Sequence, residues 1–179
     1  SVDSEMQRIY DQAERVARGD VGVLIFGESG TGKEVLAGFI HASSPRGSKP
    51  MVAINCASLP RDLLEAELFG VERGVATGVD ARPGKFEIAD QSSLFLDEIG
   101  DADPKTQVQL LRFLDNGGFV RLGENQTRFA RVLLVAATNQ DMPRLIAEGR
   151  FRADLYHRLS ELTIAVPSLN ERREDRSEE

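Results

Sequence analysis

A lysine in a glycine-rich turn is the first group in this sequence whose type and spacing could do chemistry. Residues 27–34 read GESGTGKE and have the spacing G-x-x-x-x-G-K: Gly27, Glu28, Ser29, Gly30, Thr31, Gly32, Lys33 and Glu34. Glycines at this spacing let backbone N–H groups surround phosphate oxygens at the start of a helix. Lys33 would then reach the terminal phosphates. The alternative is a turn that only joins a strand to a helix, and the strand–turn–helix context disfavours it.

Two adjacent acids after an apolar stretch are the second such group. In LFLDE (94–98), Asp97 and Glu98 follow three apolar residues. The carboxyl end of a strand is where ligands bind in open α/β sheets. Asp97 could hold Mg²⁺ through water, and Glu98 could polarise an attacking water. The alternative is a helix-capping or solvated turn. Together with Lys33, the pair predicts hydrolysis of a nucleoside triphosphate. Position 34 usually provides a hydroxyl for Mg²⁺, but here it is Glu34, so the metal must be held otherwise.

Five apolar segments alternate with helical patterns and would position these residues. We expect strands at 21–26, 51–55, 93–97, 131–139 and 162–166. Helical spacing or an opening proline predicts helices at 4–18, 33–42, 60–69 and 104–115, and two short ones in 142–149 and 151–159. This alternation, with several continuously apolar strands, predicts a parallel sheet covered on both faces. Residues 72–85 form a long glycine-rich loop, and such loops in compact domains are usually functional or disordered.

Composition excludes several classes of function. The 179 residues suggest one domain, and a net charge of −7 disfavours a broad nucleic-acid surface. Cys56 is the single cysteine, so no intramolecular disulfide can form, and we expect it to serve buried packing. His41 and His157 lack metal-ligand spacing and are expected at the surface or partly packed. No signal-peptide core or membrane-length apolar run is present, so we expect a cytoplasmic protein without a membrane partner.

Six segments together resemble one family in nearly the whole chain and in the family's order. They are GESGTGKE, INCASL (54–59), ELFG (67–70), LFLDEIGD (94–101), ATNQD (137–141) and GRFRADLYHRL (149–159). They resemble the AAA+ ATPase core of bacterial sigma-54-dependent transcriptional activators, the enhancer-binding proteins, which also carry Glu after the lysine. The resemblance implies an α/β P-loop NTPase fold of the AAA+ type, with a five-stranded parallel sheet between helices. The family usually continues into a helical lid, which we expect to be absent from these residues. Residues 1–170 would be the ATPase core, the sigma-54 interaction domain, and 171–179 a charged tail leading toward a missing lid.

The resemblance also implies roles for five polar residues. Asn55 matches an asparagine that holds the catalytic glutamate in a switch, and Asn139 matches a sensor of the terminal phosphate. Arg152 and Arg158 match arginines that reach the nucleotide of the neighbouring subunit. Arg121 matches another position associated with the subunit interface. The alternatives are an asparagine that satisfies backbone groups, a turn residue, and solvated arginines.

The long loop aligns with the family's G-A-F-T-G-A motif, which projects toward the pore of the ring and contacts the sigma factor. The aligned residues are Gly74, Val75, Ala76, Thr77, Gly78 and Val79. Ala76 stands where the family has phenylalanine, which removes most of the apolar area offered to a partner. Either Val75 and Val79 compensate and the partner is sigma-54, or the protein acts on another partner.

From the resemblance, we expect Mg²⁺ and ATP as cofactors, bound between subunits of a hexameric or heptameric ring that remodels sigma-54 RNA polymerase. Contact with DNA would require a C-terminal domain that these residues do not contain. One alternative is a nucleotide switch of the same fold that regulates by contact, without sigma-54. Another is an unrelated P-loop enzyme such as a small-molecule kinase, which has no use for the asparagines and paired arginines.

Overall fold

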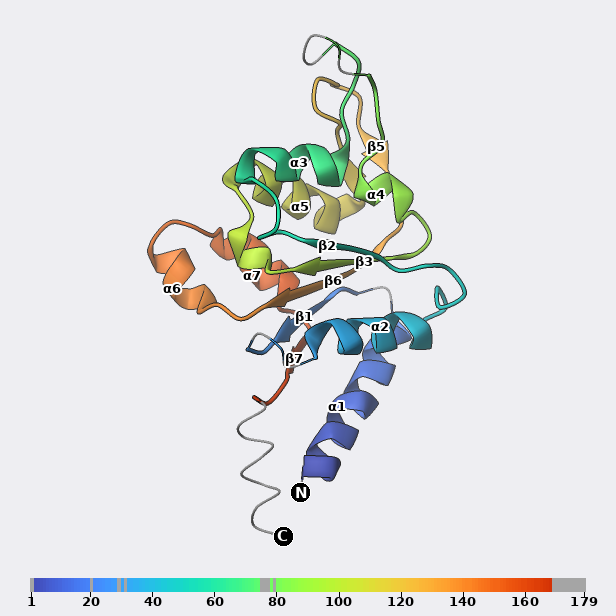
Figure 1. Cartoon of the computed structure of the whole chain (residues 1–179), viewed down its shortest axis with the longest axis vertical. Coiled ribbons are helices and arrows are strands. Elements are labelled where there is room, and N and C mark those ends of the chain that lie inside the picture. Colours follow the sequence, from blue (N-terminus) through green and yellow to red (C-terminus); the bar gives the residue numbers. More distant parts are fainter. Residues whose placement is uncertain are drawn as a thin grey trace.

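The protein is a three-layered α/β structure with a five-stranded parallel sheet in the middle (Figure 1). The computed structural model describes residues 2–19, 21–28, 30, 32–74, 78 and 80–168. The strand order is β2-β3-β6-β1-β7, and all four neighbouring pairs are parallel. The strands are β1 (Val23–Phe26), β2 (Val52–Asn55), β3 (Ser93–Asp97), β6 (Leu133–Thr138) and β7 (Thr163–Ala165). The expected fold class and all five strands are therefore confirmed.

Helices cover both faces of the sheet, as the continuously apolar central strands require. In Figure 1, α1 and α2 lie on one side, whereas α3, α4 and α5 lie on the other. The helices are α1 (Val2–Ala17), α2 (Lys33–Ser43), α3 (Arg61–Phe69), α4 (Lys85–Ile88), α5 (Pro104–Asn116), α6 (Met142–Ala147) and α7 (Ala153–Leu159). No helix among the described residues is long and apolar enough to cross a membrane.

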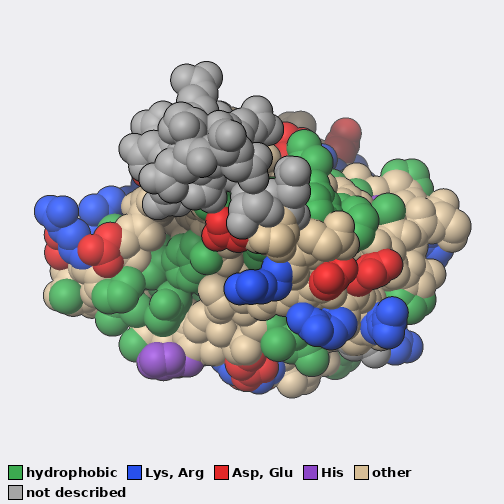
Figure 2. Space-filling view, turned by 90° about the horizontal axis from the view of Figure 1, so that it is seen from below, with side chains coloured by type: hydrophobic (Ala, Val, Ile, Leu, Met, Phe, Trp, Pro, Cys, Tyr) green, Lys and Arg blue, Asp and Glu red, His purple; other side chains and the backbone are tan. Residues whose placement is uncertain are grey.

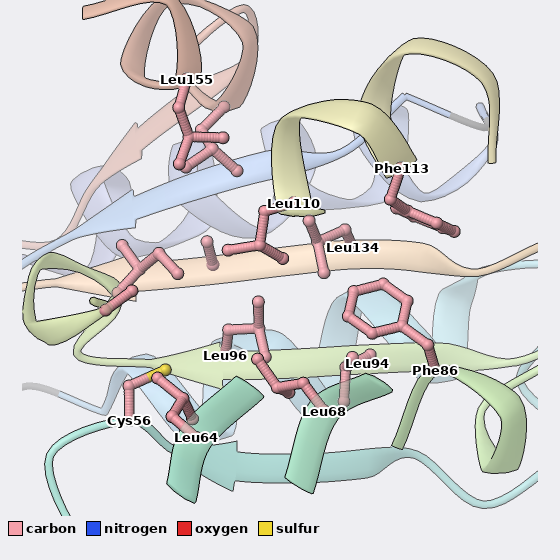
Figure 3. Packing of buried hydrophobic residues seen from close by; sticks show 14 of the residues in the cluster. Cys56, Leu64, Leu68, Phe86, Leu94, Leu96, Leu110, Phe113, Leu134 and Leu155 are labelled. Atoms are coloured by element: carbon pink, nitrogen blue, oxygen red, sulfur yellow. The ribbon is translucent and has the colours of Figure 1, made fainter. Parts of the chain in front are cut away.

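Alternate residues of each central strand enter two separate hydrophobic cores. Leu94 and Leu96 of β3 join the core under α3, α5 and α7, and Figure 3 shows them beside Leu64 and Leu68 of α3. Phe95, between them, points to the other core, under α1 and α2. This period of two fixes the register of the sheet, because a slip by one residue would exchange the two faces. The register places the polar ends of β2 and β3 side by side, with Asn55 opposite Asp97.

Four aromatic rings form the end of the first core that lies farthest from the carboxyl ends of the strands. Phe86 stacks on Phe69 with ring centroids 4.9 Å apart and an interplanar angle of 9°. It also contacts Phe113 at 4.6 Å and Phe119 at 6.0 Å. Because Phe86 is fully buried and touches all three rings, it holds α4 against α3 and α5.

Three short elements were not predicted from the sequence: α4, the 3-10 turn η1 (Ile99–Asp101), and a hairpin of β4 (Gly118–Phe119) and β5 (Arg128–Phe129). Each has at most four residues, too few to show a period. The hairpin runs beside the ends of the long loop, because Leu122 exchanges backbone hydrogen bonds with Gly70 and Glu72. Val71 and Arg82 exchange two backbone hydrogen bonds, which hold the two ends of the long loop together.

Charges of both signs are mixed on the surface next to α1. On the face shown in Figure 2, the visible Lys and Arg side chains lie among Asp and Glu side chains.

We expect Phe86→Ala to lower the free energy of unfolding by about 3–5 kcal/mol, because it leaves a cavity among three rings. Phe129→Ala is the matched control, since this phenylalanine is 67% exposed, and its effect should stay within about 0.5 kcal/mol. Urea denaturation of both variants measures the difference. Equal effects would contradict the packing described here.

Candidate functional site

The ammonium group of Lys33 lies buried at the carboxyl end of β1. Lys33 opens α2, its residue is only 5% exposed, and its Nζ donates to the carbonyl oxygen of Gly27 at 2.8 Å. The same Nζ lies 3.4 Å from Oε1 of Glu98. Gly27 is held in turn by its N–H bond to the carbonyl of Thr138 at the end of β6. The lysine therefore joins the ends of three neighbouring strands.

Glu98 has an unusual backbone and a free carboxylate oxygen. Its φ of 53° and ψ of 51° lie in the left-handed region, which is uncommon for a residue other than glycine. Its Oε2 is buried and has no hydrogen-bond partner within the described part of the chain. Strained backbone and unsatisfied buried polar atoms both cluster at functional sites. The Oε2 atom of Glu98 is therefore able to accept a hydrogen bond from a bound ligand or water.

The predicted polar residues of three strand ends line one hollow of about 560 Å³. Its lining residues are Gly30, Lys33, Asn55, Ala57, Asp97, Glu98, Asp101, Asn139 and Gln140. Sequence reasoning assigned no role to Asp101 and Gln140, although both lie within the motifs LFLDEIGD and ATNQD. The Oδ1 atom of Asn55 accepts the N–H of Ala57 at 2.9 Å, which is the backbone-satisfying role named as its alternative. Glu34 lies next to the hollow and, with Asn55 and Asp97, lines a smaller one of about 160 Å³.

The hollow fits a phosphate chain with Mg²⁺. Gly30 and Gly32 have φ values of +77° and +91°, and a side chain added at either would meet no atom within 4 Å, so the loop faces open space. The first turn of α2 has no side-chain cap, which leaves its N–H groups to bind an anion. No group of three or more His, Cys, Asp or Glu suited to a metal exists among the described residues. Mg²⁺ needs only one or two carboxylates when phosphates complete its shell.

Cys56 is buried next to Asp97, on the core side of the hollow. It is buried in the first core, as predicted, and its N–H donates to the carbonyl of Asp97 at 2.9 Å. Burial, followed by the nearby charges of Asp101, Asp97 and Glu98, raises the pKa of its thiol to about 12. Because the thiolate is the nucleophile, we expect Cys56 to be unreactive in the folded protein.

Arg152 and Arg158 lie away from the hollow that contains Lys33. Arg152 is exposed and forms a two-point ion pair with Asp154, whose hydrogen bonds raise the pKa of the guanidinium. Arg158 donates to the carbonyl of Leu114 at 2.6 Å and pairs with Glu161 at 2.9 Å. It lines a hollow of about 320 Å³ together with residues at the amino ends of β1 and β6, the edge of the sheet opposite Lys33.

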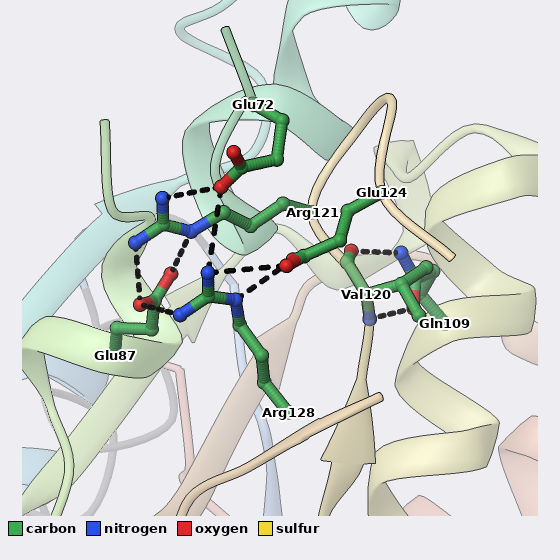
Figure 4. Close-up of polar contacts among 7 residues, drawn as sticks. All are labelled: Glu72, Glu87, Gln109, Val120, Arg121, Glu124 and Arg128. Atoms are coloured by element: carbon green, nitrogen blue, oxygen red, sulfur yellow. Dashed lines mark hydrogen bonds and ion pairs between the residues drawn. The ribbon is translucent and has the colours of Figure 1, made fainter. Parts of the chain in front are cut away.

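Arg121 belongs to a charged network at the base of the long loop (Figure 4). Its guanidinium donates to both carboxylate oxygens of Glu87 at 2.8 and 2.9 Å and to Glu72 at 2.8 Å. Arg128 adds bonds to Glu124 at 2.8 and 3.2 Å. The bonds to Glu87 raise the pKa of Arg121. The network fastens α4, the start of the loop and the hairpin to one another, whereas the predicted interface role of Arg121 stays a prediction.

Several predicted residues lie at the edge of the described structure or outside it. Gly74 and Gly78 are exposed with φ of 88° and 79°, and Glu28 is exposed beside Gly27. Outside the described residues lie Ser29, Thr31, Val75, Ala76, Thr77 and Val79 and the tail from residue 169 onward.

His41, predicted to lie at the surface or to be partly packed, is buried. Its ring is buried between the hydroxyl of Ser93 at 2.8 Å and the carbonyl of Lys49 at 2.5 Å. It therefore joins the end of α2 to the start of β3. His157 is exposed.

Comparisons with known proteins agree on one family. The family model described as "Sigma-54 interaction domain" matches residues 1–165. The Nif-specific regulatory protein of Azotobacter vinelandii is 52% identical over 171 residues, which cover 95% of this chain and 33% of that protein. NtrX from Brucella abortus in complex with ADP has a TM-score of 0.89 at 38% identity, covering 97% of this chain and 38% of that one. The same protein in complex with ATP has a TM-score of 0.88, with the same identity and coverage. The chain therefore spans about a third of the length of these relatives.

We expect Cys56 to react with iodoacetamide at pH 8 roughly 10²–10³ times more slowly in the native protein than in 6 M guanidinium. A pKa near 12 in place of 9.0 lowers the thiolate fraction, and burial blocks access. Mass spectrometry reads the result directly, because the chain has one cysteine. Rapid labelling of the native protein would contradict the packing behind Asp97.

Proposed function

This chain belongs to the sigma-54 interaction domain family, the AAA+ core of sigma-54-dependent regulators, and we propose that it binds Mg·ATP and hydrolyses it. The observation that carries the proposal is the buried pair of Lys33 and Glu98, whose second carboxylate oxygen points to no partner within the described chain. A lysine for phosphates and a carboxylate for water meet at the strand ends, where ligands bind in α/β sheets.

The residues divide the chemistry among them. Lys33 and the N–H groups at the start of α2 would bind the terminal phosphates. Asp97 would hold Mg²⁺ through water. The bound ion would neutralise negative charge on the phosphates. Glu98 would orient the attacking water and accept its proton on Oε2. Asn55 and Asn139, which line the same hollow, would contact Glu98 and the terminal phosphate respectively.

A second hollow next to the phosphate site suits the base of the nucleotide. Its volume is about 220 Å³, and it is lined by Gly32 of the glycine-rich turn and by mostly apolar side chains: Met6, Ile9, Tyr10, Val35, Leu36 and Val166. Val35 is 67% exposed there, which leaves apolar area for a planar ring to cover. The arrangement supports a nucleotide rather than free polyphosphate as the ligand.

Hydrolysis would require a neighbouring subunit. Arg158 lies at the edge of the sheet opposite Lys33, so one subunit cannot bring both to the same phosphate. A head-to-tail interface places opposite faces of two copies together and closes into a ring. We therefore propose that Arg152 and Arg158 act on the next subunit's nucleotide in a hexamer or heptamer. Such an arginine neutralises transition-state charge and makes turnover depend on assembly.

The long loop would transmit hydrolysis to sigma-54 RNA polymerase, and its two ends are held together by the pairing of Val71 with Arg82 beside the hairpin. Residues 1–170 would form this ATPase core and 171–179 would lead toward a lid. DNA binding would belong to a further C-terminal domain. Ala76 favours the alternative, a regulator of the same fold with another partner or a nucleotide switch, because it offers little area for contact.

Glu98→Gln should keep ATP binding within about threefold and lower turnover by about 10³-fold or more, because the amide cannot accept a proton. Glu124→Gln is a matched control at a carboxylate outside the hollow, and its turnover should stay near wild type. A coupled phosphate-release assay and fluorescent-nucleotide titration separate the two quantities. Normal turnover in Glu98→Gln would exclude it as the base.

Wild-type protein should co-migrate with purified sigma-54 on a native gel when ADP–aluminium fluoride is present, and Ala76→Phe should bind more tightly. Burial of the added ring would contribute about 1.5–3 kcal/mol, roughly tenfold or more in affinity. No binding by the wild type together with binding by Ala76→Phe would establish that another partner has replaced sigma-54. No binding by either variant would favour the nucleotide switch.

A further inference from the structure

Gln107 is a buried polar side chain inside α5, where an apolar residue would be expected. It is 1% exposed, and its amide nitrogen donates to the carbonyls of Ala102 at 2.8 Å and Arg150 at 3.0 Å. Its amide oxygen accepts the backbone N–H of Arg152 at 2.9 Å. Both donors and one acceptor site are used, so the amide is well satisfied and its orientation is fixed.

The three bonds join two segments that are far apart in the sequence. Ala102 ends the short turn that begins directly after Glu98. Arg150 and Arg152 lead into α7, the helix that carries Arg158. Gln107 therefore fastens the turn behind the proposed base to the segment that carries one of the proposed trans arginines. Removal of its amide would leave two carbonyls and one N–H without partners in the interior.

The far end of α5 makes a second contact with α7. Arg158 donates to the carbonyl of Leu114 and lies 3.5 Å from the carboxylate of Asp115, both near the end of α5. Because α5 is held by α7 at both ends, the two helices form one unit. A shift of the turn after Glu98 would therefore reach the arginines through α5.

We propose that Gln107 is a positioning residue for Arg152. Through Gln107, the state of one subunit's own nucleotide site determines the position of the Arg152 side chain that reaches the nucleotide of the next subunit. This inference rests on the proposed function, since it assumes that Arg152 acts across an interface. The Arg152 guanidinium is exposed and its pairing with Asp154 is local, so the backbone at this residue decides where the side chain points.

The test uses mixed rings of the full-length protein. Gln107→Met keeps the length and shape of the side chain and removes all three bonds. Alone, it should lower turnover at saturating ATP by about tenfold or more, because a small misplacement of a catalytic group is costly, while KM for ATP changes by less than about twofold. Addition of Glu98→Gln subunits, which hydrolyse nothing but have an intact Gln107, should restore turnover. At equal amounts, up to about a quarter of the interfaces would pair a working site with a working arginine.

Control mixtures keep the outcomes distinct. Arg152→Ala mixed with Glu98→Gln must regain turnover; if it does not, the proposed trans role of Arg152 and this inference both fall, whereas ATP hydrolysis at Glu98 is not affected. If that mixture regains turnover but Gln107→Met with Glu98→Gln does not, Gln107 serves only its own subunit and this inference alone is wrong.

Two further variants separate positioning from stability. Gln109→Met removes a buried amide from the same helix, where it bonds both backbone groups of Val120 at 2.7 and 3.2 Å. It reports what the loss of such an amide does to thermal stability. If Gln107→Met does not fold, Gln107→Glu is tested in the same mixtures, because it loses both bonds that the amide donates, to Ala102 and to Arg150, and should therefore also lower turnover. Restoration by Glu98→Gln subunits supports the inference, and lack of restoration overturns it.

Discussion

The burial of the Lys33 ammonium is the constraint on which the rest of the structure depends. A charge that is 5% exposed is stable only with partners, and here they are the carbonyl of Gly27 and the carboxylate of Glu98. These partners come from the ends of two strands that are separated by β6 in the sheet. The sheet, its register and its two cores therefore serve to bring the carboxyl ends of β1, β3 and β6 together. A nucleotide would compete with Glu98 for the same ammonium, which couples binding to the position of the carboxylate.

Helix α5 links this pair to the more distant parts of the molecule. Gln107 bonds it to the turn after Glu98 and to the segment before α7, while Gln109 bonds it to Val120 at the base of the hairpin. Arg121, the next residue, enters the charged network that reaches Glu72 at the start of the long loop (Figure 4). Side-chain hydrogen bonds, joined by the backbone of α5 and of residues 120–121, thus connect the turn after the candidate base to both the segment before α7 and the start of the loop. Such a path is a physical route for coupling, provided that its elements have two positions.

The sequence predicted the parts of the fold that have a strong period or a rigid motif. The five strands, the helices that begin at Lys33 and Pro104, and the meeting of Lys33 with Glu98 all follow from apolar runs and from the topology of parallel sheets. It did not reveal α4 or the hairpin, whose strands of two residues carry no pattern. The burial of His41 and the bonds of Gln107 were also missed. A polar residue in a sequence does not show that its side chain will bond to groups far away in the chain.

We propose that the site of Lys33 and Glu98 is complete only when a second copy supplies its arginines. The decisive experiment measures ATP turnover per subunit against protein concentration, with particle mass measured in the same samples. Turnover per subunit should be near zero for the isolated subunit and should rise steeply as rings form. Turnover per subunit that stays constant from isolated subunits to rings would contradict it, because the site would then need nothing from a neighbour.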